Sequence, residues 1–135
     1  MTKSGLHPRV GVGVLILKDG KLLMAKRKGS HGSGTWAPPG GKLDFEEEVE
    51  ACAIRETFEE TGLEVKDPKF ITITNDIAEG THYVTLWTRA IYAGGEPRIT
   101  EPEKCDEIGW FDLNDLPSPL FLPMENLLKA GVKLA

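Results

Sequence analysis

The most informative part of the sequence is GGKLDFEEEVEACAIRETFEETGL, residues 40–63. It opens on two glycines and then runs from Glu46 to Thr61 without Gly or Pro, in a segment rich in Glu, Ala and Arg. These residue types favour a helix, and Gly62 supplies the residue that most readily ends one in a left-handed conformation. The segment therefore predicts a glycine turn followed by a helix over 46–61.

Three carboxylates crowd one side of this expected helix. At about 100° per residue, Glu56 and Glu60 project within about 40° of each other, and Glu59 lies about 60° from Glu56. Like charges so close repel, and the repulsion grows when water is removed, so a cation is the simple remedy. Carboxylate oxygens suit Mg²⁺, with Mn²⁺ as the alternative ion. The other reading of a glutamate-rich helix is a solvated surface, which we expect for three further residues: Glu46, Glu48 and Glu50.

Arg55 lies beside the carboxylates on the same helix. It can pair with Glu59 one turn away, or with Glu48 toward the N-terminus, and such pairs would orient the carboxylates. The alternative is a surface ion pair of little energetic value.

Upstream of the helix, Val10–Leu17 and Lys21–Lys26 flank the turn residues Asp19-Gly20, a pattern that predicts a hairpin of two strands. Residues 27–41, RKGSHGSGTWAPPGG, contain five glycines and two prolines and are expected to form a long loop. Loops of this length in a small domain are usually functional.

Downstream, β-branched and aromatic residues predict strands over Phe70–Asn75 and His82–Tyr92, and a short strand over Glu107–Asp112. A final helix is expected near Met124–Ala130. Strands on both sides of a helix, with a second helix at the end, indicate an α/β fold in which helices cover a mixed β-sheet. At 135 residues we expect one domain over 1–135.

Composition limits the function. The net charge of -5 argues against a nucleic-acid partner, because such binding needs clustered Lys and Arg. No stretch approaches the roughly 18 apolar residues of a membrane span, and no export signal is visible, so we expect no membrane partner. Cys52 and Cys105 are too few for a disulfide framework, and reduced thiols favour a cytoplasmic protein.

Residues 41–63 resemble the Nudix box, G-x5-E-x7-R-E-U-x-E-E-x-G-U, in which U is a bulky apolar residue. Eight positions match: Gly41, Glu47, Arg55, Glu56, Glu59, Glu60, Gly62 and Leu63. Thr57 departs from the pattern at the first U position. Three further stretches, KRKGS (26–30), HYVT (82–85) and EPEKC (101–105), look like a subgroup of nucleoside-triphosphate diphosphatases of animals and plants. That subgroup usually reads LPGGHLEF where this chain has APPGGKLDF, a difference that bears on substrate preference.

The resemblance implies a Nudix fold of α/β/α type and a Mg²⁺-dependent reaction. Glu56 and Glu60, with Glu59, would bind the ion, a backbone carbonyl near Gly40 would be a further ligand, and Gly41 would allow a tight turn against the helix. Glu47 and Arg55 would support these ligands, and catalysis would involve Glu56, Glu59 and Arg55. For the general base, Glu56, Glu59 and Glu103 stay open as alternatives.

Substrate contacts are predicted outside the helix at Arg27, Trp36, Gly40, Gly41, His82 and Glu103. Arg27 offers a planar fork of donors to phosphate, although it could equally be one solvated cation among several. Trp36 lies in the glycine loop, where a base could stack on it. His82 lies in HYVT and is either structural or a substrate contact, whereas His31 is expected to be exposed.

The leading hypothesis for function is hydrolysis of normal or oxidised (d)NTPs to the monophosphate and pyrophosphate. A second takes another diphosphate, such as a prenyl diphosphate or a nucleotide sugar. A third is a non-catalytic nucleotide-binding regulatory module, which the presence of every glutamate of the box argues against. A homodimer is expected only by analogy with related proteins.

Overall fold

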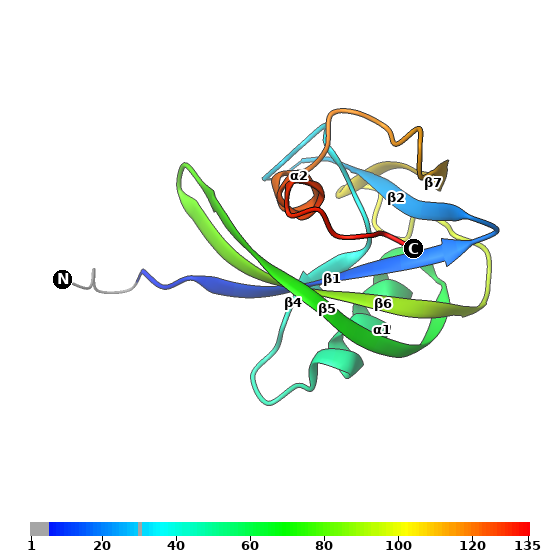
Figure 1. The fold of residues 1–135 in the computed structure, drawn as a ribbon, viewed down its shortest axis with the longest axis horizontal. Helices are drawn as coiled ribbons and strands as arrows, with labels where there is room; N and C mark the ends of the chain where they lie inside the picture. Colours follow the sequence, from blue (N-terminus) through cyan, green and yellow to red (C-terminus); the bar gives the residue numbers. More distant parts are fainter. Residues whose placement is uncertain (1–5, 30) are drawn as a thin grey trace.

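The computed structural model describes residues 6–29 and 31–135 (Figure 1). Residues 1–5 of the expected domain, and Ser30 of the KRKGS stretch, lie outside the described residues. The strands are β1 (Arg9–Lys18), β2 (Lys21–Arg27), β3 (Trp36–Ala37), β4 (Gly40–Lys42), β5 (Glu64–Ala78), β6 (Thr81–Gly94) and β7 (Cys105–Asp112). The helices are α1 (Val49–Thr61) and α2 (Leu122–Lys129).

All seven strands belong to one mixed sheet. The main path runs β3-β2-β1-β6-β5, with β4 also paired to β1 and β7 also paired to β2. Strands β1 and β6 run parallel over nine residue pairs, and the other neighbours are antiparallel.

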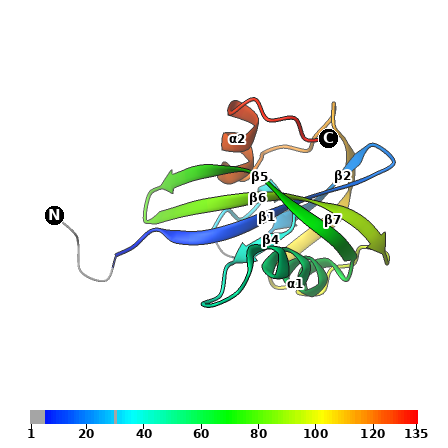
Figure 2. The same cartoon turned by 60° about the horizontal axis from the view of Figure 1, so that its bottom comes forward.

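The two helices lie on opposite faces of this sheet, as Figure 2 shows with α2 above and α1 below. One core cluster joins α1 to the sheet through Cys52, Ala53, Val14 and Ile16, and the other joins α2 to it through Met124, Leu127 and Trp87. The expected α/β/α arrangement, a mixed sheet between helices, is thereby confirmed.

The five predicted strands are present, and two short strands, β3 and β4, were not predicted. The N-terminal hairpin is confirmed, whereas β5 extends well beyond Phe70–Asn75 and β6 exceeds His82–Tyr92 by three residues. The β5–β6 hairpin is paired along its whole length, so the polar residues at the start of β5 are also part of the strand. The register there shifts between Lys66 and Lys69. Residues 27–41, expected as a loop, also contain β3 and the beginning of β4.

Helix α1 begins three residues later than expected. Glu46 has a φ of 65°, a left-handed conformation that cannot be part of a right-handed helix. The Glu47 carboxylate accepts a hydrogen bond from the Asp44 backbone N–H, at 3.1 Å, and closes a turn ahead of the helix. Gly62 ends the helix with a φ of 76°, as predicted.

Strand β1 changes partner along its length, and this opens the sheet. It pairs with β4 at Gly11–Gly13 and with β2 only at Leu17 and Lys18. Strands β1 and β2 therefore diverge toward the N-terminal end of β1. Gly13 on β1 leaves room for the Trp87 ring, which a Cβ atom at this position would overlap.

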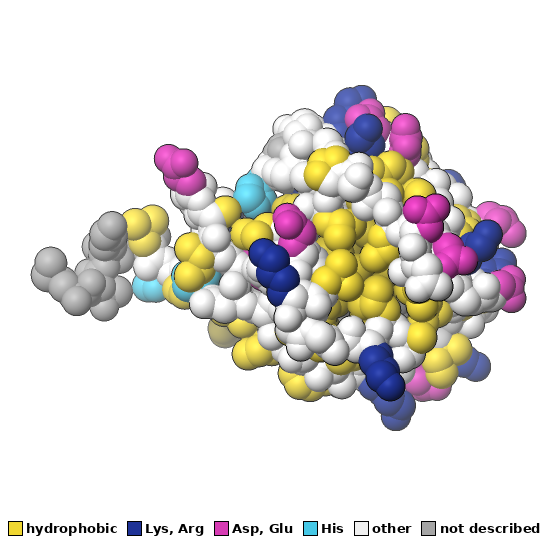
Figure 3. All heavy atoms as spheres, turned by 45° about the horizontal axis from the view of Figure 1, so that its top comes forward, with side chains coloured by type: hydrophobic (Ala, Val, Ile, Leu, Met, Phe, Trp, Pro, Cys, Tyr) yellow, Lys and Arg dark blue, Asp and Glu magenta, His cyan; other side chains and the backbone are white. Residues whose placement is uncertain are grey.

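Hydrophobic side chains remain visible on the face that carries α2 (Figure 3). Eight partly buried hydrophobic residues pack against the second core cluster: Leu17, Ile71, Phe111, Leu113, Leu116, Leu120, Val132 and Leu134. Neither of the described helices is long and apolar enough to cross a membrane.

Candidate active site

A cleft of about 920 Å³ occupies the opening of the sheet. Its walls come from β1, β4, the C-terminal half of α1, the β5–β6 hairpin and the start of α2. Of the residues predicted to form the site, six line this cleft: Arg27, Gly40, Gly41, Glu56, Glu60 and His82. The other four, Arg55, Glu59, Trp36 and Glu103, are not among its lining residues.

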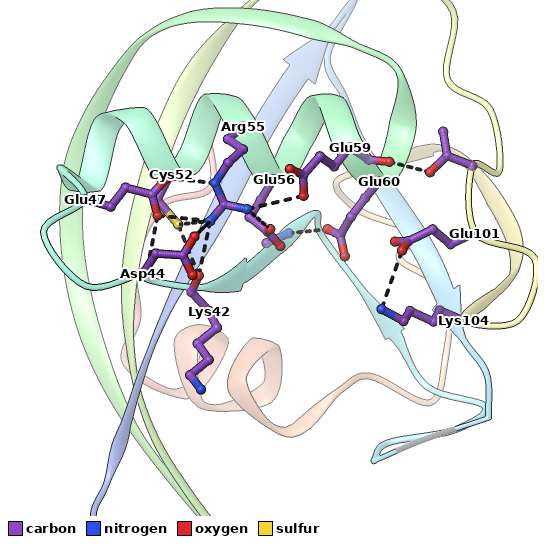
Figure 4. Close-up of polar contacts among 12 residues, drawn as sticks. Lys42, Asp44, Glu47, Cys52, Arg55, Glu56, Glu59, Glu60, Glu101 and Lys104 are labelled. Carbon is purple, nitrogen blue, oxygen red and sulfur yellow. Dashed lines mark hydrogen bonds and ion pairs between the residues drawn. The ribbon is translucent and has the colours of Figure 1, made fainter.

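Glu56 and Glu60 extend from α1 toward β4 and the cleft, as the close-up in Figure 4 shows. The Gly40 backbone N–H donates to Glu60 Oε1 at 2.9 Å, and Arg55 Nη1 donates to Glu56 Oε1 at 2.6 Å. One oxygen of each carboxylate is thus held in place. Among the described residues, the Oε2 atoms of both have no hydrogen-bond partner.

Gly41 allows the close approach of β4 to α1. A Cβ atom built on this residue would overlap the Glu56 carboxylate, so any other residue would push Glu56 out of position. The same holds in part at Gly40, where a Cβ atom would overlap the Val12 carbonyl oxygen. The tight approach predicted for Gly41 therefore has a concrete steric reason.

Arg55 is the centre of a network of carboxylates. Its Nε donates to Glu47 Oε2 at 2.7 Å and its Nη2 to Glu47 Oε1 at 3.0 Å, which makes a bidentate pair. Its Nη1 also reaches Glu59 at 3.3 Å, and its Nη2 lies 3.3 Å from Asp44. The expected pairing with Glu59 is present, and the partner toward the N-terminus is Glu47 rather than Glu48.

This network fixes the charges around Arg55. Hydrogen bonds from Arg55, with one from the Asp44 N–H, lower the pKa of Glu47 to about 2, and the same pair raises the pKa of Arg55. Both groups are therefore ionised near neutral pH. Arg55 can then hold Glu56 by charge as well as by geometry.

The electrostatics of Glu60 are different. Burial raises its pKa to about 7, Glu56 and Glu101 add to the shift, and the Gly40 N–H and Arg27 oppose it. Burial also raises the pKa of Glu56, although Arg55 opposes the shift. Two carboxylates that resist ionisation in a cleft favour the arrival of a positive charge.

These residues fit a divalent metal ion. No group of three His, Cys, Asp or Glu side chains in residues 6–29 and 31–135 forms a ready metal cage. Glu56 and Glu60 instead offer one unpartnered hard oxygen each beside the backbone of Gly40 and Gly41. Glu59 turns toward Arg55 and leaves 54% of its side chain exposed, so its predicted ligand role requires a change of side-chain conformation.

Positive side chains also line the cleft. The Arg27 guanidinium lies 4.0 Å from the Phe121 ring centroid, and its Nε donates to the His31 carbonyl at 3.0 Å. Lys104, from the loop before β7, also lines the cleft and lies 3.5 Å from Glu101. A polyphosphate entering the cleft would meet both cations.

Glu101 is the site residue that the sequence did not single out. It lines the cleft, and Figure 4 shows its carboxylate facing the same space as that of Glu60. Glu103, predicted from the same loop, is exposed and does not line the cleft. Both glutamates lie in EPEKC, so the sequence marks them equally as candidates. Only the path of the folded loop shows which one faces the cleft.

Trp36 has a core position. Its side chain is buried, and its ring meets that of Phe111 edge to face with centroids 5.0 Å apart. The expectation that a base stacks on Trp36 is therefore wrong for this structure, because the ring completes the core beneath the loop. His82 does line the cleft, and its Nε2 lies 2.5 Å from Asn75 Oδ1.

Several expectations of minor roles agree with the structure. Glu46, Glu48 and Glu50 are exposed, as is His31 at the edge of the cleft. Cys52 is buried, and burial raises its pKa to about 12, so it is a poor nucleophile.

The model of the NUDIX domain matches residues 7–130 of the chain. The chain belongs to the Nudix family. It is a Nudix hydrolase, and Nudix hydrolases generally depend on divalent metal ions. All eight positions that match the box lie within the residues that the model covers, and they include the two carboxylates in the cleft.

Several known proteins are similar to the chain. It is 37% identical to an "ADP-ribose pyrophosphatase" of Methanocaldococcus jannaschii, over 86% of this chain and 69% of that protein. It is 29% identical to a "NAD-capped RNA hydrolase NudC" of Stutzerimonas stutzeri, over 83% of this chain but only 40% of that protein. The crystal structure of a MutT Nudix hydrolase from Burkholderia pseudomallei is 38% identical, with a TM-score of 0.83 over 90% of this chain and 99% of that one.

These relatives come from bacteria and an archaeon, so the resemblance to a subgroup of animals and plants is not confirmed. Their printed names differ in substrate. The family match therefore establishes a Nudix hydrolase and leaves its substrate unassigned.

Proposed function

We propose that the chain hydrolyses nucleoside triphosphates, normal or oxidised, to the monophosphate and pyrophosphate in a Mg²⁺-dependent reaction. The observation that carries the proposal is that Glu56 and Glu60 share one cleft with Arg27 and Lys104. The carboxylates suit a metal ion, and the two cations suit a chain of phosphates longer than the metal alone would neutralise.

Glu56 and Glu60 would hold the ion through their Oε2 atoms, together with a backbone carbonyl near Gly40. Bound Mg²⁺ would activate the attacking water and neutralise charge on the phosphates. Arg55 keeps Glu56 in position through the hydrogen bond at 2.6 Å, and its bidentate pair with Glu47 keeps the guanidinium itself in place. Arg55 is accordingly assigned a positioning role.

Arg27 would bind and orient the phosphates. Its guanidinium rests on Phe121 and is anchored by its bond to His31, so part of its side-chain freedom is already lost before substrate arrives. Lys104 would extend the cationic surface along the leaving pyrophosphate.

Glu101 is the carboxylate we assign as proton acceptor for the attacking water. Glu56 and Glu60 are committed to the ion, and Glu59 and Glu103 do not line the cleft. The water proton would move to the Glu101 carboxylate as the phosphoanhydride bond breaks. Removing a general base of this kind lowers turnover roughly 10²- to 10⁴-fold, which is the expectation for Glu101→Gln.

A panel of nucleoside triphosphates with Mg²⁺, with pyrophosphate measured directly, tests the proposal. Glu60→Gln should abolish turnover, and Glu50→Gln is the matched control because Glu50 is an exposed glutamate on the same helix. No turnover of any triphosphate by the wild-type protein would refute the proposal. Survival of activity in Glu60→Gln would refute the assignment of the ligand.

A second candidate is hydrolysis of ADP-ribose, favoured by the 37% identity to the protein named ADP-ribose pyrophosphatase. Its products would be AMP and ribose 5-phosphate, and chromatography separates them from those of a triphosphate. Prenyl diphosphates and nucleotide sugars belong in the same panel. The ratio of kcat/KM values decides between these substrates.

A homodimer and a cytoplasmic location stay predictions. Light scattering of the purified protein tests the first, and fractionation of cells that express it tests the second.

A further inference from the structure

A buried carboxylate lies in the cleft away from the metal-binding glutamates. Asp76 on β5 is only 3% exposed, and it lines the cleft. Its Oδ2 accepts hydrogen bonds from Thr74 Oγ1 at 3.1 Å and from Thr85 Oγ1 at 2.5 Å, and its Oδ1 accepts one from Asn126 Nδ2 at 2.9 Å.

This carboxylate is held entirely by neutral donors. Within residues 6–29 and 31–135, no Lys, Arg or His side chain forms an ion pair with Asp76. A carboxylate offers about four acceptor positions, and three are filled, so one position on Oδ1 is left. A buried acceptor in this state gains from one more donor.

The donors come from three elements, and each fixes the orientation of Asp76. Thr74 is itself held by Trp87, whose Nε1 donates to Thr74 Oγ1 at 3.0 Å. Asn126 reaches Asp76 from α2, whose first residues, Leu122 and Pro123, line the cleft. The acceptor is thus rigid and lies among aromatic and apolar surfaces, the setting in which proteins read the edge of a nucleobase.

The position of Asp76 relative to the metal-binding end suits a nucleotide. Asp76 and Glu56 line the same cleft. In the sheet, Asp76 is paired with Tyr83 on β6, Tyr83 with Arg9 on β1, and Val12 on β1 with Gly41 on β4. Three steps between strands of about 4.8 Å and three residues along β1 of about 3.3 Å each place the backbones of Asp76 and Gly41 roughly 17 Å apart. A nucleotide with its base at Asp76 and its phosphates at Glu56 would extend along the cleft between them.

We propose that Asp76 selects substrates whose base carries an exocyclic amino group. One N–H of the amino group would donate to the remaining acceptor position on Oδ1, whereas a carbonyl at the same place would face the carboxylate with two lone pairs and be repelled. The inference rests on the proposed function, because it assigns the base end of the same substrate. The alternative is that Asp76 only ties β5 to β6 and α2.

The wild-type protein gives the first test, through two matched pairs of substrates. ATP and ITP differ by an amino group against a carbonyl, and so do CTP and UTP. In the pair with the higher kcat/KM, the amino member should be preferred roughly 10- to 100-fold, the range expected for a hydrogen bond to a charged group. Equal rates, or preference for the carbonyl member, would overturn the inference.

Asp76→Asn gives the second test. The amide of the variant can donate where the carboxylate only accepts, so the preference for the amino member should fall at least tenfold relative to wild type. Asp115→Asn is the control, because it removes an exposed carboxylate far along the chain and should leave the ratio unchanged. If Asp76 only holds the structure together, Asp76→Asn should lower the melting temperature and leave the ratio of kcat/KM values between amino and carbonyl members unchanged. That result would also overturn the inference.

Binding of monophosphates without metal separates this inference from the proposed function. Calorimetry with AMP and IMP, and with CMP and UMP, measures base preference with no hydrolysis. A preference for the amino members in an enzyme that hydrolyses no triphosphate would leave the inference standing and refute the proposed function. Hydrolysis of triphosphates with no preference for the amino members in binding or turnover would support the proposed function and refute the inference.

Discussion

Glu60 should destabilise the metal-free protein at alkaline pH, and Glu60→Gln should remove this effect. Burial raises the pKa of Glu60 from 4.5 to about 7, so the folded state binds a proton that the unfolded state releases. Stability from this group is then present at low pH and is lost as pH rises from about 4.5 through 7. Between those values the metal-free protein becomes progressively less stable.

The pKa difference sets the size of the effect. A shift from 4.5 to about 7 corresponds to about 3 kcal/mol at pH 8. Partial solvation of the cleft reduces this, so Glu60→Gln should raise the free energy of unfolding at pH 8 by about 1 to 3 kcal/mol. For a domain of this size that is a rise in Tm of roughly 3 to 9 °C.

Thermal unfolding of the wild type and of Glu60→Gln in chelator, at several pH values between 5 and 8, measures this dependence of stability on pH. Glu59→Gln is the control, since it removes the same charge from an exposed position one residue away and should keep the pH dependence of the wild type. Mg²⁺ should then raise the Tm of the wild type more than that of Glu60→Gln. An unchanged pH slope in Glu60→Gln would show that burial does not control this carboxylate.

Three further changes test other parts of the site. Arg55→Ala should lower kcat/KM roughly 10- to 100-fold, the usual loss when a residue that orients metal ligands is removed, and an unaltered rate would refute its positioning role. Gly41→Ala should abolish turnover while circular dichroism shows a folded protein, because a Cβ atom there overlaps Glu56; Gly109→Ala, where a Cβ atom meets only ordinary contacts, is the control and should retain the wild-type rate. Thr57→Val should raise the free energy of unfolding by about 1 kcal/mol in chemical denaturation, because the Thr57 hydroxyl is buried without a hydrogen-bond partner among the described residues, and a loss of stability would contradict this.

The sequence predicts the local parts of the site well. Glu56 and Glu60 share a helix face because of their spacing, and Gly62 ends that helix because of its backbone freedom. These properties depend on neighbouring residues alone. The α/β/α class also follows, since the order of strands and helices allows few ways to bury the apolar faces.

Long-range placement is what the sequence could not supply. Glu101 and Glu103 lie two residues apart in one loop, and only the folded loop directs the first into the cleft. Trp36 belongs to a glycine-rich segment that suggests an exposed loop, yet β3 pairs with β2 and carries it into the core. Asp76 lies in the middle of a strand, and its three hydrogen-bond donors come from β5, β6 and α2.

In the proposed reaction, Glu56 and Glu60 form a metal-dependent centre that cleaves the phosphate chain next to the nucleoside. Phosphorus-31 NMR of a nucleoside triphosphate incubated with the protein and Mg²⁺ identifies the bond that is cleaved. We expect the monophosphate and pyrophosphate in equal amounts, and neither in chelator nor with Glu56→Gln. Formation of the diphosphate and orthophosphate, or turnover that persists in chelator, would contradict the claim.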